Sequence, residues 1–230
     1  KAPGWFDRCG VVRMSLLYLN KAHYPVTTLG PGRRIGLWLQ GCALACPGCV
    51  SRDTWGFEPD RALPLPVLLA WCREMASAGL DGVTLSGGEP FEQPAALLAL
   101  LEALCDWREA AGLNFDILCY SGLPWRRLQR EFAAILARLD AIIPEPFQAR
   151  HPTRLLWRGS ANQPLIPLSP LGRERYAPYP DREAERRPFQ VAVDGERVWA
   201  IGIPGAGDMD RLEQRCAERG LRLGGVSWRA

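Results

Sequence analysis

The chain has 230 residues, 47% of them apolar and 23% charged, and its 28 basic residues nearly balance its 25 acidic ones. At about 150 residues per domain the length corresponds to one large domain or one domain with an appendage, and the apolar content excludes a disordered chain. No apolar run approaches the ~18 residues of a membrane-spanning helix, and a net charge of +3 is too small to indicate a nucleic-acid or membrane partner.

Strands and helices are expected to alternate through the first part of the chain. Apolar runs predict strands at residues 14–19, 35–40, 82–85, 115–120 and 140–143. Apolar residues at helical spacing predict helices at residues 65–78, 94–111 and 125–139. This alternation predicts βα units and a mainly parallel sheet.

The last part of the chain has a different character. Residues 172–188 are rich in Arg, Glu, Asp and Pro, which predicts an exposed connector. A β-hairpin around an Asp-Gly turn is predicted over residues 189–203. A helix at residues 208–219 and a final strand at residues 221–226 are expected to follow.

Five of the eight cysteines show no metal-ligand spacing: Cys9, Cys72, Cys105, Cys119 and Cys216. A chain of this size can build its own hydrophobic core, so a disulfide framework is not expected. We interpret Cys72, Cys105 and Cys119 as small buried hydrophobic residues, the usual role of a free cysteine, and Cys9 and Cys216 as structural or incidental.

The other three cysteines form one cluster, Cys42-x3-Cys46-x2-Cys49, on a loop that contains Gly and Pro. Thiolates this close together can converge on one inorganic centre. Structural zinc prefers four ligands in two separated pairs, and neither His23 nor His151 lies in the loop. A 4Fe–4S cluster is normally held by four cysteines, and three would leave one iron open to a substrate. The spacing favours iron–sulfur and leaves zinc as the alternative.

A second motif, residues 86–90 (Ser-Gly-Gly-Glu-Pro), follows a predicted strand. The carboxyl ends of parallel strands are where α/β proteins bind ligands, and glycines allow close backbone approach. By itself the motif indicates only a turn. Together with the cysteine loop before it, it resembles the radical S-adenosylmethionine (radical SAM) enzymes.

Further segments narrow the resemblance to the anaerobic ribonucleotide reductase activating proteins, a group of glycyl-radical-enzyme activases. They are GPGRR at residues 30–34, LQGC at 39–42, CPGC at 46–49, DTW at 53–55, YSG at 120–122, EPF at 145–147 and WRGSANQ at 157–163. The resemblance covers residues 25–168, and the tail from Leu171 is not part of the family's compact pattern.

The resemblance implies an α/β fold, an incomplete (β/α)6 radical SAM barrel with a C-terminal α+β extension. We place the radical SAM core at residues 1–170. The extension, with its connector, hairpin, helix and strand, is placed at residues 171–230.

The resemblance also implies the site. Cys42, Cys46 and Cys49 are expected to hold one 4Fe–4S cluster. Cofactor-binding residues for S-adenosyl-L-methionine are expected at Gly87, Gly88, Glu89 and Ser121. One electron from the cluster would cleave S-adenosylmethionine to methionine and a 5′-deoxyadenosyl radical. That radical would take a hydrogen atom from a backbone glycine of a large partner enzyme.

Other residues of these motifs are not expected to bind the cofactor directly. Asn162 and Gln163 are interpreted as amides that bond to the backbone. Arg34 is placed either near the cluster or at the surface, and Trp55 and Trp157 are interpreted as packing residues.

The expected partners are a glycyl radical enzyme, such as an anaerobic ribonucleotide reductase, and a flavodoxin- or ferredoxin-type electron donor. A cytoplasmic location is expected, because an open cluster and its thiolates require a reducing environment and residues 1–10 lack the apolar core of a signal peptide.

Two alternatives remain open. One is a radical SAM enzyme of the same fold that acts on a peptide or small metabolite. The other is a non-catalytic zinc or iron–sulfur binding module. A site whose mouth is blocked by residues 171–230 would count against a large protein substrate.

Overall fold

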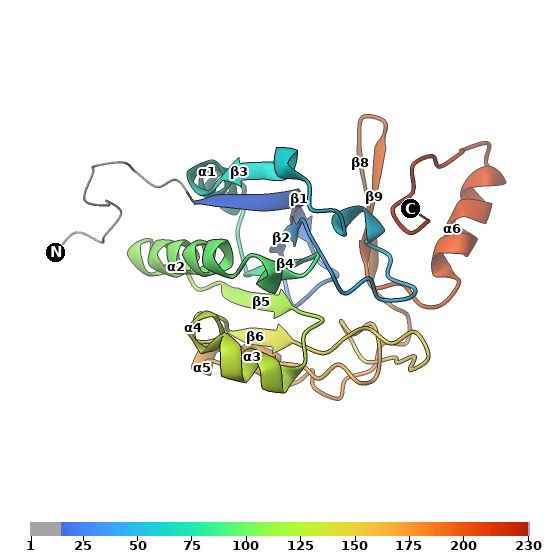
Figure 1. Cartoon of the computed structure of the whole chain (residues 1–230). Coiled ribbons are helices and arrows are strands. Elements are labelled where there is room, and N and C mark those ends of the chain that lie inside the picture. Colours follow the sequence, from blue (N-terminus) through green and yellow to red (C-terminus); the bar gives the residue numbers. More distant parts are fainter. Residues whose placement is uncertain (1–14, 230) are drawn as a thin grey trace.

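The computed structural model describes residues 15–229. The predictions for Cys9, for residues 1–10 and for Met14 lie outside this range. A seven-stranded sheet in the order β3-β1-β2-β4-β5-β6-β7 forms the centre of the molecule (Figure 1). Its strands are β1 (Leu16–Val26), β2 (Arg34–Leu39), β3 (Ala62–Pro64), β4 (Gly82–Gly87), β5 (Asp116–Tyr120), β6 (Ala141–Ile143) and β7 (Ile166–Pro167).

Four neighbouring strands of this sheet, β2, β4, β5 and β6, are parallel, as the alternation of strands and helices predicted. The remaining strands pair antiparallel at the two edges, with β1 and β3 beside β2 and with β7 beside β6. The chain therefore has a mixed α/β fold around a parallel centre.

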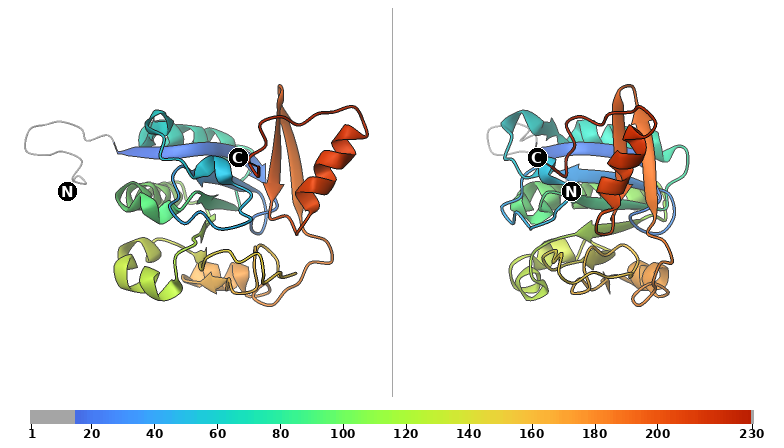
Figure 2. Two further views of the ribbon diagram at one scale, coloured as in Figure 1. Left: turned by 45° about the vertical axis from the view of Figure 1, so that its right-hand side comes forward. Right: turned by 90° about the vertical axis from the view of Figure 1, so that its right-hand side faces the viewer.

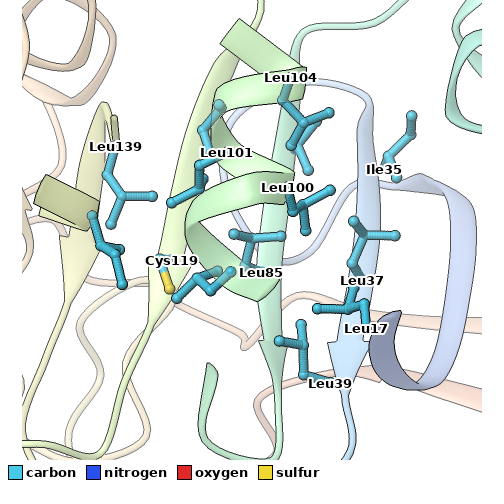
Figure 3. Close-up of a cluster of buried hydrophobic side chains, with 14 of the residues drawn as sticks. Leu17, Ile35, Leu37, Leu39, Leu85, Leu100, Leu101, Leu104, Cys119 and Leu139 are labelled. Carbon is cyan, nitrogen blue, oxygen red and sulfur yellow. The ribbon is translucent and has the colours of Figure 1, made fainter. Parts of the chain in front are cut away.

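Helices cover one face of the sheet. They are α1 (Leu65–Ala76), α2 (Pro94–Ala110), α3 (Trp125–Glu131) and α4 (Ala133–Leu136). The core lies between them and the sheet, where Leu100, Leu101 and Leu104 of α2 face Leu37 and Leu85 of the strands (Figure 3). Short 3-10 helices occupy three connections: η1 (Arg52–Thr54), η2 (Pro59–Arg61) and η3 (Pro90–Glu92).

Side chains alternate between the two faces of each strand. Leu37, Leu85 and Cys119 pack in the core under the helices. Their neighbours Trp38, Ser86 and Tyr120 line a cavity on the other face instead. The opposite face of the sheet is thus the one available for a site.

The predicted burial of Cys72, Cys105 and Cys119 is confirmed for the first and the last of these. Cys72 and Cys119 are fully buried in the main core, whereas Cys105 and Cys216 are partly exposed.

The predicted helix over residues 125–139 is interrupted. α3 ends and α4 begins at Phe132, whose φ of −130° and ψ of 32° are not helical. The ring of Phe132 packs edge-on against Phe91 with centroids 5.0 Å apart. A tertiary contact therefore accompanies the break in a segment that is helical by periodicity.

The tail contains α5 (Pro170–Tyr176), the hairpin β8 (Phe189–Asp194) and β9 (Arg197–Gly202), and α6 (Asp208–Ala217). The predicted hairpin and helix are confirmed. The prediction of an exposed connector is wrong for its first residues, because Ser169 caps α5 by accepting a bond from Gly172 N at 2.9 Å and Tyr176 is fully buried. The predicted final strand is also wrong: residues 221–226 form no strand, and Gly225 has a φ of +60°.

The division of the chain at residue 170 stays a prediction. α5 begins at that point, but its Tyr176 packs edge-on against Trp157, with ring centroids 6.1 Å apart. Trp157 is itself 7% exposed, so the packing role predicted for it is confirmed.

Both placements predicted for Arg34 are wrong. Arg34 opens β2, at the end opposite the cysteine loop, and is fully buried. Its guanidinium donates to both carboxylate oxygens of Asp116, at 2.7 and 3.0 Å, and its Nε donates to Thr84. Glycine at position 82 makes space for the Arg34 side chain, because a Cβ there would lie 2.1 Å from the guanidinium. Arg34 is therefore a structural ion-pair residue.

In the part of the chain that the structure describes, every helix is too short or too polar to cross a bilayer.

Candidate functional site

The cysteine loop leaves β2 through Gly41, whose φ of +98° is unfavourable for other residues. Its start is tied to the segment that follows the third cysteine: Gly41 N donates to Thr54 O at 2.8 Å, and Cys42 N donates to Trp55 O at 3.1 Å. Cys49 N donates to Cys46 O at 3.1 Å. These bonds close the loop on itself, so all three thiols are presented by one compact unit.

The Gly87-Gly88-Glu89 turn is joined directly to this loop. Gly88 N donates to Leu39 O at 2.8 Å, and Glu89 N donates to Gly41 O at 2.9 Å. A Cβ on Gly88 would lie 2.3 Å from Gly41 O, and one on Gly87 would lie 2.4 Å from Leu39 N. Glycine is therefore required at both positions for the turn to reach the cysteine loop.

Glu89 is 1% exposed, and its carboxylate accepts three hydrogen bonds. The donors are Phe91 N at 3.1 Å, Ser121 Oγ at 2.9 Å and Gly122 N at 2.7 Å. All three are neutral, and within residues 15–229 no cation forms an ion pair with Glu89. Burial raises the pKa of Glu89 to about 7, against the opposing effect of these hydrogen bonds.

Ser121, predicted as a cofactor contact, uses its hydroxyl inside the protein. The Oγ donates to Glu89 and accepts from Leu123 N at 3.0 Å. Its observed contacts thus orient the Glu89 carboxylate, and direct contact with a ligand stays a prediction.

These groups share one cavity of about 550 Å³. The lining brings together all the residues predicted for the site: Cys42, Cys46, Cys49, Gly87, Gly88, Glu89 and Ser121. The tail adds a wall, which includes Arg187, residues 202–207, Met209 and Trp228. Figure 2 shows the hairpin and α6 beyond the ends to which the parallel strands point.

A sequence family described as "4Fe-4S single cluster domain" matches residues 28–166, more than half of the chain. The chain belongs to this family. The matched residues include the whole cysteine loop and the Gly-Gly-Glu turn.

Several proteins similar to this chain carry the name anaerobic ribonucleoside-triphosphate reductase-activating protein. The protein from Enterobacteria phage T4 is 29% identical over 59% of this chain and 85% of its own length. The one from Vibrio cholerae is 30% identical over 61% of this chain and 92% of its own length. The family and enzyme type predicted from the motifs, that of the reductase-activating proteins, are confirmed.

One solved structure, QueE from Escherichia coli, is 20% identical and aligns with a TM-score of 0.41 over 59% of this chain and 72% of its own.

The donor set fits the cluster that gives the 4Fe–4S family its description. The three cysteines are free and half-buried, and they line the cavity. Burial raises the pKa of Cys42 and of Cys46 and so favours the protonated thiol, whose proton a metal centre must displace in order to bind. Of the two centres that the spacing left open, the family description favours iron–sulfur over zinc. As the side chains now lie, no three His, Cys, Asp or Glu residues within 15–229 are arranged to hold a single metal ion.

The two amides of the last motif bond to the backbone, as predicted. Asn162 Nδ2 donates to Pro146 O at 2.8 Å, and Gln163 Nε2 donates to Glu145 O at 2.9 Å. Gln163 also lines the cavity, as does Trp55, whose ring lies 5.6 Å from the Arg52 guanidinium.

Sequence reasoning missed the wall contributed by the tail. Met209 and Trp228 lie about 160 to 180 residues beyond the cysteine loop, and no motif accompanies them. Long-range contacts of the tail bring them to the cavity. The hairpin, for example, docks against the segment before β2: Gln190 Nε2 donates to Pro25 O at 2.7 Å, and Thr28 Oγ1 donates to Ile201 O at 3.1 Å.

Proposed function

We propose that this chain is a radical SAM activating enzyme that binds one 4Fe–4S cluster through Cys42, Cys46 and Cys49 and cleaves S-adenosylmethionine. When bound, such a cluster supplies the electron that breaks the sulfonium C–S bond, which leaves methionine and a 5′-deoxyadenosyl radical. That radical takes a hydrogen atom from a substrate and becomes 5′-deoxyadenosine. The protein itself binds and orients the cluster and S-adenosylmethionine and excludes water from them.

The uncompensated carboxylate of Glu89 carries this proposal. A buried charge without a counter-ion is unfavourable, and Glu89 lines the same cavity as the three cysteines. The α-ammonium of S-adenosylmethionine is a cation that could complete the pair. Gly87 and Gly88 bring the backbone close to the cysteine loop, so an amino acid moiety held there would lie beside the cluster.

The substrate proposed first is a backbone glycine of a partner enzyme, such as an anaerobic ribonucleotide reductase. The names of the relatives support this choice. The incomplete (β/α)6 barrel, a flavodoxin- or ferredoxin-type electron donor and a cytoplasmic location belong to the same proposal.

A peptide or a small metabolite is the second candidate substrate. It is favoured by the wall that the tail adds, because Met209, Trp228 and Arg229 line the cavity on the side of the extension. A large partner must bring its glycine loop past this wall.

The test is anaerobic reconstitution of the full chain with iron and sulfide, followed by dithionite reduction and measurement of 5′-deoxyadenosine. We expect about four irons per chain and turnover of S-adenosylmethionine. Cys46→Ala should abolish both the absorbance of the cluster and the product. Cys105→Ala, a partly exposed cysteine on α2, is the matched control and should leave both intact. Zinc in place of iron, or a cluster without turnover, would contradict the proposal.

A further inference from the structure

A segment that follows α6 returns to the cysteine loop. Residues 225–229, called here the C-terminal strap, form a turn closed by Arg229 N, which donates to Val226 O at 3.3 Å. Ser227 Oγ donates to Val50 O at 3.0 Å, and Arg52 N donates to Ser227 O at 3.2 Å. The strap thus donates one hydrogen bond to the segment that directly follows Cys49 and accepts another from it.

The other side of the strap is anchored on α6. Trp228 Nε1 donates to Glu213 Oε1 at 2.7 Å, and the Arg229 guanidinium lies 2.7 Å from the other oxygen of the same carboxylate. Glu213 is 21% exposed, so this anchor is partly shielded from water. The strap therefore links a helix of the extension to the loop that carries the three cysteines.

The segment between the strap and the core is held from both sides. Thr54 Oγ1 donates to Ser51 O at 2.6 Å, and Thr54 O accepts from Gly41 N at the start of the cysteine loop. Val50, Ser51 and Trp228 all line the cavity. Movement of the strap would remove the bonds at Val50 and Arg52 and leave Ser51 held by Thr54, while the amino side of the loop keeps its own backbone bonds.

We propose that the C-terminal strap is a positioning device for the cluster: it fixes the Cys49 end of the cysteine loop and covers that side of the cavity. Ser227 acts as a positioning residue through the Val50 and Arg52 backbone. The inference rests on the proposed function, because it assigns Cys49 to the cluster. Since hydrogen bonding and solvent exposure set the potential of an iron–sulfur cluster, loss of the strap should change the cluster as well as the loop.

The first measurement is hydrogen–deuterium exchange of the cluster-free full chain, which reads the Arg52 amide without any cofactor. Ser227→Ala should raise exchange in the segment around Arg52 about fivefold, the effect of one net hydrogen bond. Ser227→Thr keeps the hydroxyl and should restore the wild-type rate. Ser77→Ala is the matched control, because Ser77 Oγ makes the same kind of bond, to Glu74 O at 2.7 Å, at the end of α1.

The second measurement uses the reconstituted protein. Ser227→Ala should bleach about fivefold faster in air and should shift the electron paramagnetic resonance spectrum of the reduced cluster, with rescue by Ser227→Thr. A chain that ends at Gly224 should show both changes more strongly.

A chain that ends at Gly224 lacks the Ser227 carbonyl that accepts from Arg52 N. Exchange at Arg52 that is equal in wild type, in Ser227→Ala and in this shortened chain would overturn the strap, whether or not a cluster is bound. An unchanged spectrum and bleaching rate in Ser227→Ala would overturn its role toward the cluster. A wild-type chain that takes up no iron would instead contradict the proposed function, and the exchange experiment would still report on the strap.

Discussion

The parallel strands carry a buried carboxylate at each end, and only one of the two is paired with a cation from the part of the chain that the structure describes. At the amino ends, Asp116 is fully buried and its charge is matched by Arg34, with a further guanidinium, Arg175, 3.3 Å away. At the carboxyl ends, Glu89 is equally buried, but its three hydrogen-bond donors are neutral. Only the second carboxylate lines the cavity.

The difference distinguishes a buried carboxylate that stabilises the fold from one that is left able to bind a cation. A buried carboxylate that the protein neutralises itself contributes to a closed core, and its removal leaves an uncompensated charge. A buried carboxylate left without a cation has a raised pKa and gains from any cationic ligand that enters. The comparison predicts that substitutions at the amino ends change stability, whereas substitutions at the carboxyl ends change ligand binding.

The largest effect is expected from Asp116→Ala, which leaves the Arg34 guanidinium buried and unpaired. Breaking such a pair costs about 3–5 kcal/mol of unfolding free energy, measured by urea denaturation. Glu58→Gln removes an exposed partner, 3.0 Å from Arg61, and should cost less than about 1 kcal/mol. Equal losses in the two variants would show that burial does not distinguish these pairs.

Glu89→Gln comes next and should act on binding. It removes the charge that we propose attracts the ammonium, and charged hydrogen bonds contribute about 1.5–3 kcal/mol. We therefore expect S-adenosylmethionine to bind about 10- to 100-fold more weakly, as measured by calorimetry on the reconstituted protein. Unchanged affinity in a folded variant would refute the role given to Glu89.

The pH dependence gives a sharper test of the same carboxylate. The pKa of Glu89 is raised to about 7 in the folded chain, so the folded state binds more protons than the unfolded state between pH 4.5 and 7. Unfolding free energy should therefore fall as pH rises through this window, and this contribution should be absent in Glu89→Gln. Urea denaturation of the cluster-free chain at pH 5 and pH 8 measures it.

Ligand binding should follow the opposite trend. If the ionised carboxylate attracts the ammonium as proposed, affinity for S-adenosylmethionine should be about tenfold lower at pH 6 than at pH 8. The same titration with Glu89→Gln is the control. An equal pH dependence in that variant would assign the effect to another group.

The smallest effect is expected from Ser121→Ala. The variant removes one neutral donor to Glu89, so the pKa of Glu89 should rise further and S-adenosylmethionine should bind about fivefold more weakly. Titrating the affinity of the variant against pH measures both changes. A loss of affinity without a shift along the pH axis would indicate direct contact between Ser121 and the ligand instead.

Local signals predicted most of the core. The helices α1 and α2 follow from apolar periodicity, and strand β5 follows from its apolar run, because these patterns fix which face of each element is buried. The signal for α5 is the Ser169-Pro170 pair at its start, but the charged run after it suggested a connector. The expected strand at residues 221–226 has alternating leucines, yet Gly224 and Gly225 interrupt it.

The sequence by itself predicted which residues share the cavity. The Cys42, Cys46 and Cys49 spacing and the Gly87-Gly88-Glu89 turn are local patterns, and short segments at the ends of neighbouring parallel strands meet with little dependence on the rest of the chain. Tertiary structure alone decided which carboxylate is neutralised and what closes the cavity. Arg34 meets Asp116 across 82 residues, and Ser227 meets Val50 across 177. Such contacts depend on how whole elements pack, and a single sequence carries no local pattern for them.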